Sequence, residues 1–213
     1  MRIHLIALPI ALFLALPAAA QDIGSVREVR DWAYGTPEAS NRRDLFARTK
    51  VTANERVETV ANGGLHLRFL DRTDFHLGPE SVVFLDEFVY DRKTSAGKMA
   101  LTLSKGTFRF ISGKMKKDLI TLRTPTALIG IRGTNFLVSV ADNGATGIIV
   151  EEGEVDVTPN LGGGDTVAVL AGSTVAVTAT GAVEVGAQVT IQDPAAAGPG
   201  DGGQNESEGG SAH

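Results

Sequence analysis

The sequence contains no cysteine, which excludes a disulfide framework, a thiolate metal site and a cysteine nucleophile. Aromatic residues make up only 6% of the 213 residues, so the stacking platforms common in sugar-binding domains have few candidates beyond Trp32 and Tyr34. The formal net charge of −5 disfavours general binding to nucleic acid, because phosphate contacts draw on clustered Lys and Arg. With 43% hydrophobic residues the chain still has enough apolar side chains for one folded domain.

The chain also lacks the HExxH, GxSxG and GxxxxGK[ST] motifs, so metalloprotease, serine hydrolase and P-loop chemistry have no starting point. His66 and His76 could meet across a hairpin, but no third ligand of convincing spacing accompanies them. Paired carboxylates such as Asp71 and Asp74 could act as acid and base, yet strand edges and turns carry such residues by default. We therefore predict no catalytic residue, no bound metal and no cofactor, and hence not an enzyme.

Both ends of the chain differ from the middle. Met1 and Arg2 precede an apolar run, and residues 17–20 (Pro-Ala-Ala-Ala) fit an A-x-A cleavage site, so residues 1–20 are predicted to be a signal peptide. An uncleaved membrane anchor is the alternative, since a span needs about 20 apolar residues. Residues 193–213 are rich in Gly, Ala and Ser and predict a disordered acidic tail. We expect a periplasmic or secreted protein with no transmembrane helix in its mature form and one domain over residues 21–192.

Apolar residues between these ends recur with a period of two. Residues 65–69, 99–103 and 136–140 alternate in this way, and turn signals such as Asn-Gly-Gly at 62–64 separate the segments. About a dozen short strands at intervals of roughly ten residues predict an all-β fold of twisted antiparallel sheets, sandwich-like or solenoid-like. A weak echo supports this: glycines 106, 153 and 172 each precede an alternating strand, although their separations of 47 and 19 residues give no fixed period.

Residues 124–138 read TPTALIGIRGTNFLV and resemble the signature strand of the FecR-type domain family. Segments 67–73, 103–106 and 150–155 are similar to other segments of that family, so the resemblance covers about residues 51–176. It implies an extracytoplasmic all-β domain, best known as the periplasmic part of regulators that relay the occupancy of outer-membrane iron transporters to sigma factors. Because the sequence opens on an export signal, we expect a stand-alone secreted form without direct sigma-factor contact.

We interpret the signature strand as structural. Gly133 would permit a bulge or a close backbone approach. Arg132, if buried, would need a carboxylate from the acidic run over residues 151–156, and its loss would then lower stability sharply. The residues that carry the signature are Thr124, Pro125, Ala127, Gly130, Arg132, Gly133, Thr134 and Phe136.

Charge is distributed unevenly along the chain. Residues 21–132 carry 19 basic and 14 acidic groups, whereas residues 133–213 carry 11 acidic groups and no Lys or Arg. The two halves could pair in space and neutralise each other. Alternatively, a basic face could bind a partner. The residues proposed for that face are Arg92, Lys93, Lys98, Lys114, Lys116 and Lys117.

The predicted function is that of a non-catalytic protein-binding, scaffolding or signalling module of the bacterial cell envelope. Its expected partner is another envelope or outer-membrane protein. The alternative is an envelope polysaccharide-binding protein or an enzyme that uses the basic face.

Overall fold

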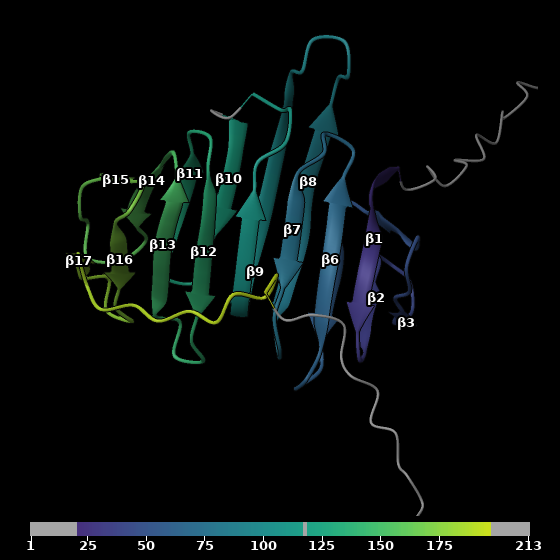
Figure 1. Ribbon diagram of the computed structural model, residues 1–213, viewed down its shortest axis with the longest axis horizontal. Helices are drawn as coiled ribbons and strands as arrows, with labels where there is room; N and C mark the ends of the chain where they lie inside the picture. Colours follow the sequence, from purple (N-terminus) through teal and green to yellow (C-terminus); the bar gives the residue numbers. More distant parts are fainter. Residues whose placement is uncertain (1–20, 117–118, 197–213) are drawn as a thin grey trace, which may run out of the picture.

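The computed structural model describes residues 21–116 and 119–196, and within these residues the chain forms seventeen β-strands (Figure 1). The strands lie in two layers that share one long strand, β9 (Gly97–Ile111). No helix that could cross a membrane is found in the described part of the chain. The predicted all-β class is therefore confirmed.

The first sheet contains the second part of β9, and the second sheet contains its first part. The spatial order in the first sheet is β4 (Lys50–Thr52), β1 (Asp22–Arg30), β6 (Gly64–Phe69), β7 (Asp74–Leu77), β9, β12 (Asn135–Val140), β13 (Thr146–Glu152), β16 (Thr174–Val177) and β17 (Val183–Val185). The order in the second sheet is β3 (Arg43–Asp44), β2 (Ala33–Thr36), β5 (Glu55–Thr59), β8 (Val82–Tyr90), β9, β10 (Ile120–Arg123), β11 (Ala127–Ile131), β14 (Glu154–Pro159) and β15 (Val167–Leu170).

The chain winds between the two layers, mostly placing two strands in one sheet and the next two in the other. Neighbouring strands are antiparallel except β9 and β10, which are parallel. This winding combines the sandwich-like and solenoid-like arrangements that the sequence predicted. There are more strands than the predicted dozen because strands as short as β3 and β4, with two and three residues, are too brief to show alternation.

The core lies between the layers and follows from the period of two, since alternate side chains of a strand point to opposite faces. One inward row of the first sheet joins the buried residues Leu67, Phe75, Phe110, Phe136 and Val150 across five strands. The rings of Phe110 and Phe136 are 5.5 Å apart. A continuous hydrophobic cluster extends from Ile23 to Val177.

The three glycines of the sequence echo lie where the chain crosses from one sheet to the other. Gly106 lies inside β9 with φ of +106°, and a Cβ there would come within 2.4 Å of the Ser81 Cα. Gly153 joins β13 to β14 with φ of +78°, and a Cβ there would come within 1.7 Å of the Gly133 carbonyl oxygen. The three glycines therefore mark sheet crossings, and at Gly106 and Gly153 the crossing also has no room for a side chain, whereas a Cβ at Gly172 would meet nothing within 4 Å.

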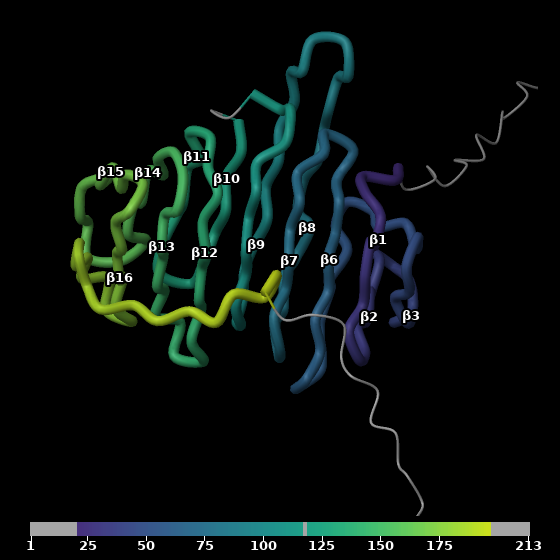
Figure 2. The backbone as a smooth tube through the Cα atoms, in the orientation of Figure 1, coloured from purple at the N-terminus to yellow at the C-terminus, as the bar shows by residue number. Residues whose placement is uncertain are grey.

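After β17 the chain runs across the outer face of the first sheet as an extended segment, residues 186–196, which we call the C-terminal strap. Figure 2 shows it in yellow, crossing β16, β13 and β12 toward β7. Asp193 bonds Arg109, and Pro194 is buried. Ordered contacts thus extend past Gln192; residues 197–213 of the predicted tail and the predicted signal peptide lie outside the described residues.

Candidate functional site

Five exposed cations gather where three loops meet at one end of the two layers. Two come from the β8–β9 turn, two from the loop after β9 and one from the β6–β7 turn, and none forms an ion pair among the described residues. We call this cluster the cationic rim: Arg72, Arg92, Lys93, Lys114 and Lys116.

The rim includes four of the six residues predicted for the basic face and adds Arg72. Lys98 lies near it on β9, but its ammonium pairs with the Glu87 carboxylate at 2.8 Å. Lys117 lies outside the described residues. The cluster could be predicted because most of its members are close in sequence.

Backbone hydrogen bonds hold the three loops of the rim together. The Lys116 amide donates to the Ser95 carbonyl at 3.1 Å, and the Lys114 amide donates to the Asp71 carbonyl at 2.8 Å. These bonds fix the backbone positions from which the cationic side chains extend, so little backbone ordering remains to be done when a partner binds.

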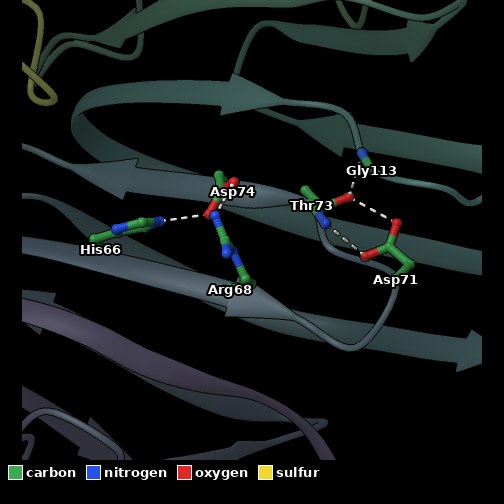
Figure 3. Close-up of polar contacts among 6 residues, drawn as sticks. All are labelled: His66, Arg68, Asp71, Thr73, Asp74 and Gly113. Carbon is green, nitrogen blue, oxygen red and sulfur yellow. Dashed lines mark hydrogen bonds and ion pairs between the residues drawn. The ribbon is translucent and has the colours of Figure 1, made fainter.

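A buried carboxylate organises the β6–β7 turn, as Figure 3 shows. The Asp71 side chain is fully buried and accepts hydrogen bonds from the Thr73 amide at 3.0 Å and the Thr73 hydroxyl at 2.7 Å. The Thr73 hydroxyl in turn accepts a bond from the Gly113 amide at 3.0 Å. Asp71 is thus committed to the turn and does not face solvent as an acid or base.

Another carboxylate of this end is also committed to its own loop. The Asp91 carboxylate accepts hydrogen bonds from the Lys93 amide and the Thr94 hydroxyl, both at 2.8 Å. The bond from the Lys93 amide is the main cause that lowers the pKa of Asp91. Asp91 therefore closes its turn, and it forms no ion pair with the neighbouring cations Arg92 and Lys93 in the part of the chain that the structure describes.

The outer face of the first sheet carries a second polar cluster, on β6 and β7. His66 and His76 are cross-strand partners, as predicted, and their rings stack with centroids 4.0 Å apart. Arg68 donates two hydrogen bonds of 2.8 Å to Asp74, and His66 Nε2 lies 2.6 Å from Asp74 Oδ1 (Figure 3). Burial of the Asp74 carboxyl acts to raise its pKa, but the bonds from Arg68 and His66 outweigh it and the pKa is lowered.

His76 is only partly exposed to solvent. Burial, followed by the nearby His66 ring, lowers the pKa of His76 to about 4. The strap residues Pro194 and Ala195 border the hollow beside the two rings. Among the described residues, no group of three or more potential ligands is placed to hold a metal ion.

Arg109 lies next to this pair on β9 and forms the most extensive ion-pair network of this face. Its side chain is only 11% exposed and bonds both oxygens of Glu151, at 2.6 and 2.9 Å, and both oxygens of Asp193, at 2.8 Å each. It also donates to Asn135 Oδ1 at 2.6 Å. Sequence reasoning missed this residue because its partners lie 42 and 84 residues away.

The signature strand is built into the fold, as β11 and the start of β12. Ala127 and Phe136 are buried, and Thr124 accepts the Ala127 amide at 2.9 Å while receiving the Thr146 hydroxyl at 2.8 Å. Gly133 has φ of +93° and lies against Gly153. The Thr134 side chain is buried, Pro125 is exposed, and Gly130 has room for a Cβ, which would meet the Asp156 Cβ at 3.6 Å.

The condition placed on Arg132, that it be buried, is not met. Its side chain is 62% exposed, although it does bond two carboxylates of the expected acidic run, Asp156 at 2.6 Å and Glu154 at 3.7 Å. Ile129 and Ile131 point into the core, so alternation directs Arg132 outward. The expected large loss of stability on removing Arg132 therefore has no basis.

Trp32 and Tyr34, the two aromatic residues considered for a sugar-binding platform, do not both have a free ring face. Trp32 is 48% exposed. The Tyr34 ring is covered by the Arg42 guanidinium, which lies 3.5 Å from the ring centroid. Stacking of a sugar on Tyr34 would have to displace that cation.

The FecR family model, described as FecR protein, matches residues 55–156. Two solved structures of a protein from Parabacteroides distasonis ATCC 8503, described as a proposed anti-sigma factor, are also similar. Each has 16% sequence identity and a TM-score of 0.49, with 61% of this chain and 58% of that chain covered. This chain thus spans less than two thirds of the length of those structures. Comparison with curated proteins gave no match.

Proposed function

The chain carries a FecR domain, and from this premise we propose that it is an exported, non-catalytic binding module of the cell envelope whose cationic rim docks an acidic surface of another envelope protein. The observation that carries the proposal is the set of five exposed cations on three interlocked loops, without a carboxylate partner among the described residues. Clustered charge of one sign steers an oppositely charged partner and fixes its orientation.

A protein partner is favoured over a polysaccharide for two reasons. The backbone under the rim is held in place by hydrogen bonds, which suits a partner of defined shape. The aromatic face of Tyr34, which a sugar would use, is occupied by Arg42. A scaffolding or signalling role follows if docking links the FecR domain to a receptor or an assembly.

Export is part of the proposal and rests on residues 1–20. The short positive start, apolar run and A-x-A site support cleavage after Ala20. N-terminal sequencing of the protein from the periplasmic or secreted fraction should begin at Gln21. A membrane-bound product that still begins at Met1 would contradict export in this form.

The rim can be tested with poly-L-glutamate as the acidic probe. The mature protein should bind it, with affinity that falls steeply as NaCl rises from 25 to 300 mM, because the contacts are between exposed charges. Lys114→Gln with Lys116→Gln should weaken binding about tenfold, the effect of roughly 1.4 kcal/mol. Isothermal titration calorimetry measures both effects.

Lys105→Gln is the matched control for Lys116→Gln alone, since Lys105 lies on β9 beside Pro79 and Glu80, outside the three loops of the rim. Equal weakening by the two substitutions would mean that net charge, and not the rim, governs binding. Salt-independent binding would contradict the proposal. Tighter binding to an anionic polysaccharide of equal charge density would favour the sugar-binding alternative.

A further inference from the structure

The C-terminal strap is attached to the first sheet at a few separate points. The Gly186 amide donates to the Thr174 carbonyl at 2.8 Å, and the Thr174 hydroxyl donates to the Ala187 carbonyl at 2.7 Å. Val189 lies over Gly147, where a Cβ would come within 2.8 Å of a Val189 methyl carbon. The strap then reaches Arg109 through Asp193.

At Arg109 the sheet recognises a carboxylate. The guanidinium presents Nε and Nη2 to the two oxygens of Asp193 in a two-bond fork, which is the most specific geometry by which arginine binds a carboxylate. Directly after it, Pro194 is buried against Gly78. Pro194 also borders a hollow of about 50 Å³ that is lined in part by His66 and His76. The outer face of the first sheet therefore binds two consecutive residues of the strap, the carboxylate of Asp193 and the proline Pro194.

The strap can leave without disrupting the sheet beneath it. Residues 186–196 form no strand, so their departure breaks no β-ladder. Arg109 would keep both oxygens of Glu151 and the Asn135 amide oxygen, so its charge would not be stranded. The sheet and its core would remain intact, with the carboxylate-binding fork and the proline site exposed.

We propose that this outer face, from Gly147 through Arg109 to His76, is a docking groove for an extended segment of a partner protein in which a carboxylate is followed by proline. Residues 187–196 occupy the groove as an intramolecular competitor. A partner segment binds by displacing them, and its apparent affinity is reduced by the fraction of molecules in which the strap is closed. This groove is distinct from the cationic rim, so either site can fail while the other stands.

The test uses the full mature chain and a fluorescent peptide with the sequence of residues 187–196, measured by anisotropy. Asp193→Asn in the protein weakens the closed strap, so this variant should bind the peptide at least tenfold more tightly than the wild type. Asp165→Asn, the same change on an exposed loop residue, should leave the wild-type affinity unchanged. Circular dichroism spectra of the variants serve to establish that each is folded.

Dependence on the groove is tested in the Asp193→Asn background. Adding Arg109→Lys keeps the charge but removes the fork and should reduce peptide binding at least tenfold. A peptide with its own Asp193→Asn change should bind as weakly. Equal binding of the peptide to the wild type and to the Asp193→Asn variant, or no binding to either, would overturn the proposal. A wild-type dimer that Asp193→Asn abolishes would assign the groove to the strap of a second copy and overturn it as well.

Discussion

Exposure decides what each arginine of this protein contributes. Arg132 belongs to the family signature, yet its side chain is 62% exposed. Water would therefore still solvate the guanidinium if its carboxylate partners were removed. Arg109 belongs to no signature, yet its side chain is 11% exposed and bonds two carboxylates and an amide. Ion pairs gain strength as water is excluded from them.

We predict that Arg132→Ala leaves the melting temperature unchanged within error, whereas Arg109→Met lowers the free energy of unfolding by roughly 1.5–3 kcal/mol, the range for hydrogen bonds to charged groups. Denaturant titration of the two variants beside the wild type checks both parts. A loss at Arg132 as large as that at Arg109 would mean that the signature arginine is structural after all.

The neutral form of His76 is favoured in the folded protein. Its pKa is lowered to about 4 from the usual 6.5, first by burial and then by the nearby His66 ring; Arg109 acts in the same direction, while Asp74 and Asp193 oppose the shift. The unfolded chain therefore takes up a proton at higher pH than the folded protein. Stability is fully retained above about pH 6.5 and falls as the pH drops toward 4.

We predict that His76→Gln makes the protein less sensitive to pH. The decrease in unfolding free energy between pH 7.5 and pH 5 should be smaller in this variant than in the wild type, because the variant lacks the group that the unfolded chain protonates. Thermal or urea unfolding at the two pH values measures the difference. Identical pH dependence in both proteins would show that His76 is solvated in the folded state.

Glycines lie at points where the chain of this protein crosses from one sheet to the other. β9 passes from the second sheet to the first at Gly106, and the chain crosses between β13 and β14 at Gly153. At Gly153 the positive φ and the Gly133 carbonyl act together, because either alone would disfavour a side chain. The glycines that recur in the sequence thus mark the points where the chain crosses between the two sheets.

We predict that Gly153→Ala destabilises the protein by about 1–3 kcal/mol, the cost of a strained backbone position, plus the cost of moving the Gly133 carbonyl. Gly172→Ala is the matched control, since Gly172 has φ of +80° and nothing within 4 Å of a Cβ. The difference between the two variants isolates the steric term in urea titrations. Equal losses would mean that backbone strain alone sets the cost.

The two layers form one molecule because they share β9 and a single core. The hydrophobic cluster runs from Ile23 to Val177, so the N-terminal and C-terminal strands contribute to the same buried volume. Charge is less evenly distributed between residues 21–132 and the acidic half, residues 133–213. Ion pairs of Arg109 and Arg132 join the two halves. The other cations Arg43, Arg68 and Lys98 pair with carboxylates inside the first half. Among residues 21–116 and 119–196, the acidic half therefore forms no ion pair with the cationic rim.

We predict that the protein unfolds in one cooperative transition. Trp32, the single tryptophan, lies beside β2 near one end of the sheets, whereas far-ultraviolet circular dichroism reports all strands. Because β9 cannot leave one sheet without disrupting the other, urea transitions followed by the two signals should coincide. A fluorescence midpoint well below that of circular dichroism would mean that the N-terminal strands unfold separately.

The sequence by itself determined the class of fold, the resemblance to the FecR family and the position of most rim cations. Alternation is a local property of an extended backbone, so period-two segments such as 65–69 and 136–140 become strands wherever they pair. Lys114 and Lys116 are two residues apart and therefore cluster in any fold. The outward direction of Arg132 was also present in the alternation of Ile129 and Ile131.

Only the tertiary structure decided which distant residues meet. The contact of Arg109 with Asp193 spans 84 residues, and the contact of Gly113 with Thr73 spans 40, so each depends on the order of strands in a sheet rather than on any local pattern. The tertiary structure also pairs β9 and β10 in parallel and puts Pro194 beside His76. Strand order follows from burying one continuous core between two sheets, which is a property of the whole chain.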